Sequence, residues 1–345
     1  MMKRIMFLFH SVLICSLLNA QVTDKGSLAK TCSYETEMSS YIAGQSVAYE
    51  QVLRSIPKKY IDKARNELHI AYQHTSHGTH VSRGMAGLND YKEGDDQLFG
   101  FSYMDDEFDK GEPAPIPGKL DFRDHALVSH EPEGVDAWDL GRNEKAFIQT
   151  TRNYLNDPEN AEINVVMWSW CNIATHTPEI NYLPGMDSLI AEYGVNGSKI
   201  GTGKGQRKNP VTFVFMTGHA NPGSNVGEGN PKNLAEKIVN YCKKTNQYCL
   251  DYYSIDTHDM DGNYWEDAGD NGDSEAYGGN FYTDWQNSHE LGVDWFENKI
   301  KPGGDVEFGA HNDQHITANR KAYAMWWILA RIAGWDGKSI DIAKS

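Results

Sequence analysis

Residues 163–170 read Ile-Asn-Val-Val-Met-Trp-Ser-Trp, and residues 210–217 read Pro-Val-Thr-Phe-Val-Phe-Met-Thr. In both stretches apolar, β-branched and aromatic residues follow one another with little alternation. Runs of this kind are typical of strands that are buried on both faces, as in a parallel sheet covered by helices. They predict an α/β fold, a three-layer α/β/α sandwich with a mainly parallel sheet.

Outward from these two runs, strand-like and helix-like patterns alternate along the chain, which is the rhythm of a sheet wrapped by helices. Further strands are expected at residues 68–73, 120–125 and 248–255, and helices at 142–155, 234–244 and 318–333. The pattern predicts one domain over residues 66–340, with insertions near 89–118 and 256–300. Residues 21–65 are expected to form an N-terminal leader with helical character.

The first twenty residues have the layout of a secretory signal peptide. Lys3 and Arg4 precede an apolar run over residues 5–18, and Ala20 offers a small residue for cleavage. The run is too short for a membrane anchor, which needs about 20 apolar residues. We expect cleavage after Ala20 and a secreted or periplasmic product.

The net charge of the chain limits the kinds of molecule that it is expected to bind. The chain has 48 acidic and 32 basic residues, a formal net charge of −16. Such a surface repels phosphate backbones and anionic lipids, so neither nucleic acid nor membrane is an expected partner. A small-molecule or glycan ester is the expected substrate, and the oligomeric state stays open.

Cysteine usage fits an oxidising compartment. Loss of Cys15 with the signal leaves Cys32, Cys171, Cys242 and Cys249, enough for up to two disulfides. Cys242 and Cys249 are the favoured pair, although spacing alone does not fix the connectivity. Cys171 can equally be a buried free thiol.

Polar residues cluster where the expected strands end, and sites in such folds lie at the carboxyl ends of strands. The residues expected to bind substrate there are His74, His77, Trp170, His219, Asn221 and Asp256. Trp170 is included because aromatic faces stack on sugar rings, and the chain holds nine tryptophans.

Ser76 follows the first long strand, Asn172 follows the third, and residues 309–315 read Gly-Ala-His-Asn-Asp-Gln-His before the final helix. In this arrangement the chain resembles the SGNH (GDSL-like) hydrolase superfamily over about residues 66–335. The resemblance implies a flavodoxin-like sheet and a serine esterase that needs no cofactor. It departs from the family pattern in two places: Thr75-Ser76-His77-Gly78 replaces Gly-Asp-Ser, and Asn312 stands where the family has the Asp of Asp-x-x-His.

The resemblance also implies roles for individual residues. Ser76 would be the nucleophile, His315 the base that takes its proton, and Asp313 the group that orients the imidazole. Asn172 would hold the developing oxyanion, with Gly84 or Gly87 as the accompanying glycine. The predicted reaction is hydrolysis of an acylated carbohydrate or similar ester.

Two other functions remain open from the residues alone. His74, His77 and His80 recur at a spacing of three, and other histidines and Asp256 could join them at a zinc-type centre of a hydrolase or lyase. A non-catalytic glycan-binding protein on the same fold is the second.

A structural calcium site is a separate prediction. Asp259, Asp261, Asn263 and Asp267 gather oxygen ligands around Gly262, as calcium loops do. A solvated acidic loop that keeps the protein soluble is the alternative.

Overall fold

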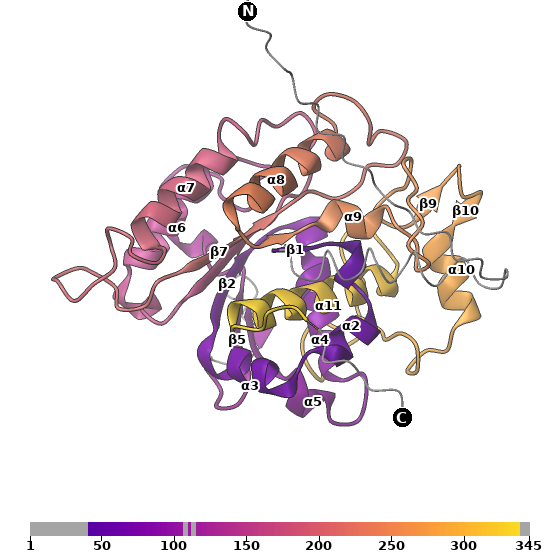
Figure 1. Ribbon diagram of the computed structural model, residues 1–345, viewed down its shortest axis with the longest axis horizontal. Helices are drawn as coiled ribbons and strands as arrows, with labels where there is room; N and C mark the ends of the chain where they lie inside the picture. The colour runs from indigo at the N-terminus through magenta and orange to yellow at the C-terminus, as the bar shows by residue number, and fades with distance from the viewer. Residues whose placement is uncertain (1–40, 106–109, 112–114, 339–345) are drawn as a thin grey trace, which may run out of the picture.

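The computed structural model describes residues 41–105, 110–111 and 115–338. The expected signal peptide and Cys32 lie outside the described residues. Within them the α/β prediction is confirmed: a mainly parallel sheet lies between two layers of helices (Figure 1).

The central sheet has eight strands in the order β1-β8-β7-β6-β2-β5-β3-β4. All neighbours pair in parallel except β3 and β4, which are antiparallel. The strands are β1 (Ile42–Ala43), β2 (His69–Gln73), β3 (Phe101–Asp105), β4 (Lys110–Gly111), β5 (Leu120–Asp124), β6 (Val165–Trp168), β7 (Thr212–Met216) and β8 (Cys249–Leu250). The core strands β5 and β6 are buried along their whole length; β6 is entirely apolar, whereas β5 buries Asp121, Arg123 and Asp124 as well.

The order of the strands shows where a ligand would bind at the sheet. After β2 the chain forms β3 and β4 at the edge of the sheet, returns to β5 beside β2, and then crosses to β6 on the other side of β2. Taken alone, β5-β2-β6-β7-β8 is the flavodoxin-like order 2-1-3-4-5, with its switch point between the first and third strands. Ligands bind outside the carboxyl ends of the strands at such a point. The segments that follow β2 and β6 carry Ser76 and Asn172.

Helices cover both faces (Figure 1). One face carries α6 (Ala146–Asn156), α7 (Tyr182–Tyr193) and α8 (Pro231–Thr245). The other carries α2 (Glu50–Ser55), α3 (Lys58–Glu67), α4 (Thr79–Asn89) and α11 (His315–Ile332), with the short α5 (Asp95–Leu98) beside them. Helix α11 is buried from His315 to Arg331 and packs on α4, so it forms the centre of that layer.

Two segments that were expected to lie outside the sheet contribute strands to it. Part of the expected leader forms β1, which pairs with β8, and part of the expected insertion at 89–118 forms β3, which pairs with β5. Residues 256–300, expected as an insertion, hold the hairpin β9 (Asp273–Ser274) and β10 (Gly279–Asn280) and helix α10 (Phe281–Ser288), which lie outside the central sheet. Their apolar side chains form a small cluster together with Ile316 of α11.

The expected strand at 248–255 is wrong beyond its first residues. Only Cys249–Leu250 pair as β8, and Tyr252–Asp256 form the helix α9. The Asp251 side chain accepts a hydrogen bond from the Ser254 backbone amide, which caps this helix. The aromatic residues Tyr252 and Tyr253 favour a strand, but they lie in a helix here because Asp251 caps it and its packed face is buried.

The favoured disulfide is absent from the structure, because Cys242 and Cys249 are both free thiols. Both are fully buried, and burial raises the pKa of Cys249 well above its ordinary value. Cys171 is also free and only half-buried.

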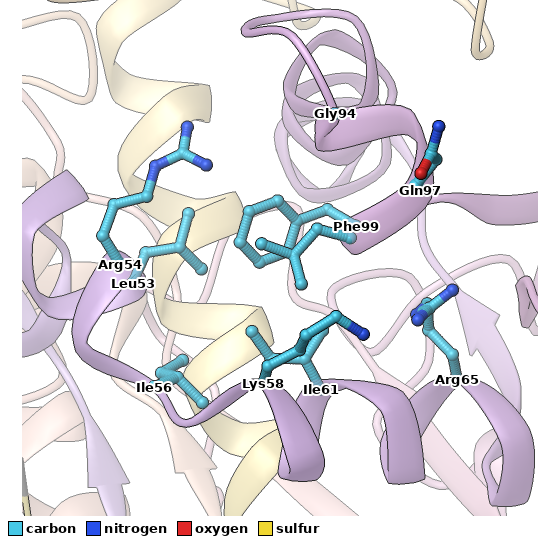
Figure 2. A pocket seen from close by; sticks show the side chains of 10 residues that line it. Leu53, Arg54, Ile56, Lys58, Ile61, Arg65, Gly94, Gln97 and Phe99 are labelled. Atoms are coloured by element: carbon cyan, nitrogen blue, oxygen red, sulfur yellow. The ribbon is translucent and has the colours of Figure 1, made fainter.

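No described helix is long and apolar enough to cross a membrane. A pocket of about 640 Å³ lies between α2, α3 and α5 (Figure 2). Apolar side chains such as Leu53, Ile61 and Phe99 line it, with Lys58 and Arg65 at its margin. Helices α3 and α5 precede β2 and β3, so this pocket lies toward the amino ends of those strands, away from Ser76.

Candidate active site

A tight turn between β2 and α4 presents Ser76. The residue has a φ of 40°, a left-handed conformation that costs a non-glycine residue about 1–3 kcal/mol. Gly78 follows in a position where a Cβ would lie 2.3 Å from the Cβ of His74, so only glycine fits. The Tyr72 hydroxyl donates to the carbonyl of Gly78 and holds the turn. A strained strand-to-helix turn of this kind is how α/β hydrolases expose a nucleophilic serine.

His311 is the histidine in contact with this serine. Its Nε2 lies 3.1 Å from Ser76 Oγ, within hydrogen-bonding distance. His311 itself has a φ of 64° and stands in the loop before α11. A serine hydroxyl that donates to an imidazole nitrogen has the geometry of a nucleophile and its general base.

The predicted base, His315, is placed elsewhere. It is the first residue of α11, and its ring stacks on Phe308. Its Nδ1 accepts a hydrogen bond from the Asn298 backbone amide, and burial lowers its pKa to about 4. Asp313 is exposed and accepts from Gln314, so it does not orient either histidine. The histidine in contact with Ser76 is therefore His311, whereas His315 packs away from the serine.

Asn172 is brought to Ser76 as predicted. Both line a cavity of about 310 Å³ with Gly141 and Cys171. The Asn172 Oδ1 accepts from the Ala174 amide at 3.0 Å and from Asn221 Nδ2 at 3.4 Å, which leaves Asn172 Nδ2 to donate to a ligand.

Gly141 accompanies Asn172, whereas the glycines expected from sequence do not. A Cβ on Gly141 would lie 3.1 Å from the Asn172 carbonyl oxygen, so the two backbones pack closely. Gly84 and Gly87 lie within α4, where they allow close packing against Ala318 and Phe296. Their role is helix packing.

A larger cavity of about 590 Å³ opens on the other side of Ser76. Trp138, which is partly exposed, and Phe308, 43% exposed, line it. Arg83 and Arg142 add positive charge. The cavity thus combines aromatic surfaces, which suit the apolar faces of a sugar ring, with strong hydrogen-bond donors.

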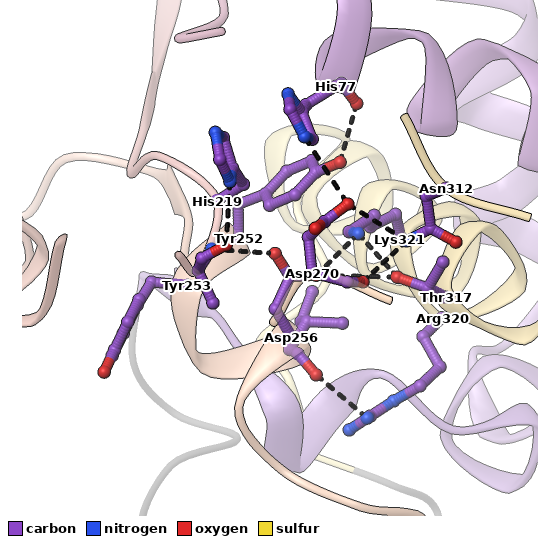
Figure 3. A network of polar contacts seen from close by, with 12 residues as sticks. His77, His219, Tyr252, Tyr253, Asp256, Asp270, Asn312, Thr317, Arg320 and Lys321 are labelled. Carbon is purple, nitrogen blue, oxygen red and sulfur yellow. Dashed lines mark hydrogen bonds and ion pairs between the residues drawn. The ribbon is translucent and has the colours of Figure 1, made fainter. Parts of the chain in front are cut away.

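Behind Ser76, His77 links a thiol to a carboxylate (Figure 3 shows the carboxylate side). His77 Nε2 lies 3.4 Å from Asp270 Oδ2, and its Nδ1 lies 3.9 Å from Cys171 Sγ. Burial alone would lower the pKa of His77, but the bonds to Asp270 and Cys171 outweigh it and raise the pKa to about 9. The pKa of Asp270 is held at about 2 by His77 against the effect of burial.

Deeper in the same network lies a buried ion pair. Lys321 Nζ of α11 donates to Asp256 Oδ1 at 2.7 Å, and both side chains are fully buried (Figure 3). Burial raises the pKa of Asp256 to about 6, although Lys321 opposes the shift. Asp256 is therefore a buried core residue behind the site, where its carboxylate pairs with Lys321.

Two other predicted substrate contacts are also interior residues. Trp170 is 2% exposed, and its Nε1 donates to the Met216 carbonyl. His74 is fully buried, with its Nε2 2.7 Å from Asp124 Oδ1. Neither side chain reaches the cavities beside Ser76. Asn221 does reach the site, through its hydrogen bond to Asn172.

Two groups of side chains lie close enough together to hold a metal ion: His74 with Asp124 and His125, and His77 with His219 and Asp270. In the second group the rings of His77 and His219 are stacked 3.6 Å apart and nearly parallel, at 11°. A metal lies near the plane of each imidazole that binds it, and two stacked planes share no such point. In the first group the 2.7 Å separation of His74 and Asp124 is that of a hydrogen bond. Both groups are arranged as hydrogen-bonded pairs.

The predicted calcium loop does not converge on an ion. Asp259 accepts from the backbone amides of Asp261 and Asn263 and from Trp265 Nε1, and Asp267 accepts from Ser274 Oγ and the Ala276 amide. Within the described residues these carboxylates form no metal-binding group. The acidic residues cap turns of the insertion instead.

Comparison with protein-family models, with curated proteins and with solved structures finds no match to this chain, so the site is interpreted from its own geometry.

Proposed function

We propose that the protein is a secreted serine esterase that acts on an acylated carbohydrate or a similar ester. The observation that carries the proposal is the 3.1 Å contact between Ser76 Oγ and His311 Nε2, at a strained turn on the ligand-binding edge of the sheet. The resemblance to SGNH hydrolases supports it, with His311 in place of His315 as the base.

The residues account for each step of acyl transfer. Ser76 attacks the ester carbonyl while His311 takes its proton, and Asn172 Nδ2 donates to the developing oxyanion. His311 then protonates the leaving alkoxide. A water molecule activated by His311 hydrolyses the acyl-enzyme and restores Ser76.

The aromatic cavity supports a sugar as the alcohol or acyl carrier. Trp138 and Phe308 line the cavity beside Ser76, and Arg142 with the Arg83–Glu307 pair adds charged groups that could hydrogen-bond sugar hydroxyls. A sugar ring held between these side chains would place an acylated hydroxyl near the serine.

The test is covalent labelling of the purified protein with a fluorophosphonate, followed by intact mass. One adduct is expected on the wild type and none on Ser76→Ala. Ser129→Ala is the matched control, because Ser129 Oγ also lies beside a histidine nitrogen, 2.9 Å from His130 Nδ1, but outside the site. It should be labelled like the wild type.

Hydrolysis of acetylated sugars would then define the substrate. Activity that survives dialysis against a chelator supports the serine mechanism. Activity lost with the metal would favour the metal-dependent alternative. A folded protein that takes no label but is retained on a glycan column would be a binding protein.

A further inference from the structure

Cys171 occupies an unusual position for a free thiol. It follows β6, is half-buried, and lines the 310 Å³ cavity together with Ser76 and Asn172. Cys242 and Cys249, in contrast, are fully buried in the core. Cys171 is therefore the described cysteine that a ligand in the site can reach.

His77 contacts this thiol with one ring nitrogen and Asp270 with the other, as the distances above show. Nucleophile, base and orienting acid thus stand in line, the arrangement by which enzymes activate a weak nucleophile. The acid is fixed in turn, because Asn312 Nδ2 donates to Asp270 Oδ2 at 3.2 Å. The Tyr252 hydroxyl donates to the His77 carbonyl and fixes the backbone of the base.

We propose that Cys171, His77 and Asp270 form a second nucleophile, base and acid in this pocket, so that Cys171 reacts as a thiolate toward soft carbon electrophiles. In the reaction with a haloacetamide, the sulfur lone pair forms a new C–S bond, the carbon–halogen bond breaks, and halide leaves. His77 keeps its proton. The thiolate is thereby a covalent modification site beside Ser76.

The charged groups around Cys171 and His77 agree with this proposal. The hydrogen bond from His77 lowers the pKa of Cys171 against the opposing effect of burial. Asp139 opposes the shift, since its charge raises the pKa of the thiol. The groups that face His77 are Asp270, Cys171, His219, His311 and the more distant His80 and Lys321. Burial lowers the pKa of His219 to about 4, so this neighbour is neutral and does not repel a protonated His77.

The test is the rate at which iodoacetamide alkylates Cys171 in the reduced, folded protein, read by peptide mass at pH 6.5 and 8.5. An ordinary thiol with a pKa of about 8.5 reacts about fifty-fold faster at the higher pH. For Cys171 we expect the two rates to agree within about three-fold. Cys242 and Cys249 serve as internal controls and should stay unmodified while the protein is folded.

Variants then assign the effect to the proposed partners. Asp270→Asn is expected to raise the ratio of the two rates by at least about ten-fold, whereas Asp273→Asn, an exposed carboxylate of the same insertion, should not change it. A wild-type ratio near fifty would overturn the proposal even if no variant folds. An unchanged ratio in folded Asp270→Asn would also overturn it.

The inference concerns the same pocket as the proposed esterase, but a different atom is read out. Fluorophosphonate reports Ser76 and iodoacetamide reports Cys171, so either can fail alone. Because both side chains line one small cavity, carboxamidomethylation of Cys171 should also block labelling of Ser76. Labelling of Ser76 in Cys171→Ala, with no loss on iodoacetamide treatment, shows that such a block acts through Cys171.

Discussion

Ser76 Oγ and His311 Nε2 meet at 3.1 Å although the two residues are 235 positions apart in the chain. Each has a positive φ, at 40° and 64°, and neither is a glycine. Strained backbone at two facing residues is typical of sites where geometry is held by the surrounding fold. Ser76 and His311 therefore each carry a local cost in backbone conformational energy.

Substitution of His311 and of His315, one at a time, tests which of the two histidines acts as the general base. His311→Gln should slow fluorophosphonate labelling of Ser76 by about 10²–10⁴-fold, because general-base assistance is lost. His315→Gln should leave the rate per folded molecule within a few-fold. The measurement is the second-order labelling constant of each variant. A larger loss in His315→Gln would return the role of base to that residue.

Asn172→Ala should lower kcat for ester hydrolysis by about 10²–10³-fold, since one oxyanion donor is removed. KM should change little if Asn172 acts mainly on the transition state. Steady-state kinetics on an aryl acetate provide the measurement. Asn181→Ala, a change at an asparagine bonded to Glu144 away from the site, is the control and should keep its kcat.

Lys321→Met should destabilise the fold by about 3–5 kcal/mol, because it leaves Asp256 buried without its partner. The double change Asp256→Asn with Lys321→Met should recover part of that loss. Lys237→Met removes exposed ion pairs, which solvent screens, and should lower the free energy of unfolding far less than Lys321→Met does. Urea unfolding followed by tryptophan fluorescence gives all three values. Equal losses for the two lysines would contradict a special role for the buried pair.

The neutral state of His315 predicts a dependence of stability on pH. Burial lowers its pKa to about 4, below the ordinary value of about 6.5, so the unfolded chain binds more protons between these two values. The contribution of His315 is complete above pH 6.5 and is lost as the pH falls toward 4. His315→Gln should therefore cost less stability at pH 5 than at pH 7. Urea midpoints of the wild type and of His315→Gln at the two pH values test this, and an equal loss at both values would contradict it.

The sheet could be predicted because its signal is local. Continuous apolar runs such as residues 163–170 report burial on both faces, and the structure places them at the centre of the sheet. The two-residue strands β1 and β8 carry too few residues for such a signal. Their pairing depends on contacts between distant segments, as does the inclusion of β3.

The site could be predicted only in part, for the same reason. Ser76 and Asn172 follow strong strands, so their convergence was predictable from topology. The choice between His311 and His315 depends on where α11 begins, and the structure begins it at His315, whose ring turns toward Phe308. Asp270 comes from an insertion with no periodic pattern, so its contact with His77 had no signal in the sequence.

Arg207 shows how misleading composition can be. It stands in the glycine-rich, basic stretch 196–209, whose composition is typical of an exposed turn. The structure buries its guanidinium, which donates to the carbonyls of Leu155, Asn160, Ala161 and Ile163. By donating to four backbone carbonyls, Arg207 links the C-terminal end of α6 to the segment that leads into β6.

The position of α11 has a consequence for shortened forms of the chain. This helix fills the centre of one layer and packs against α2, α3, α4 and β1, yet it is made last. A chain cut before residue 315 would leave the faces of α2, α3 and α4 that α11 covers open to water. The integrity of this layer therefore depends on residues that lie more than two hundred positions after its first helix.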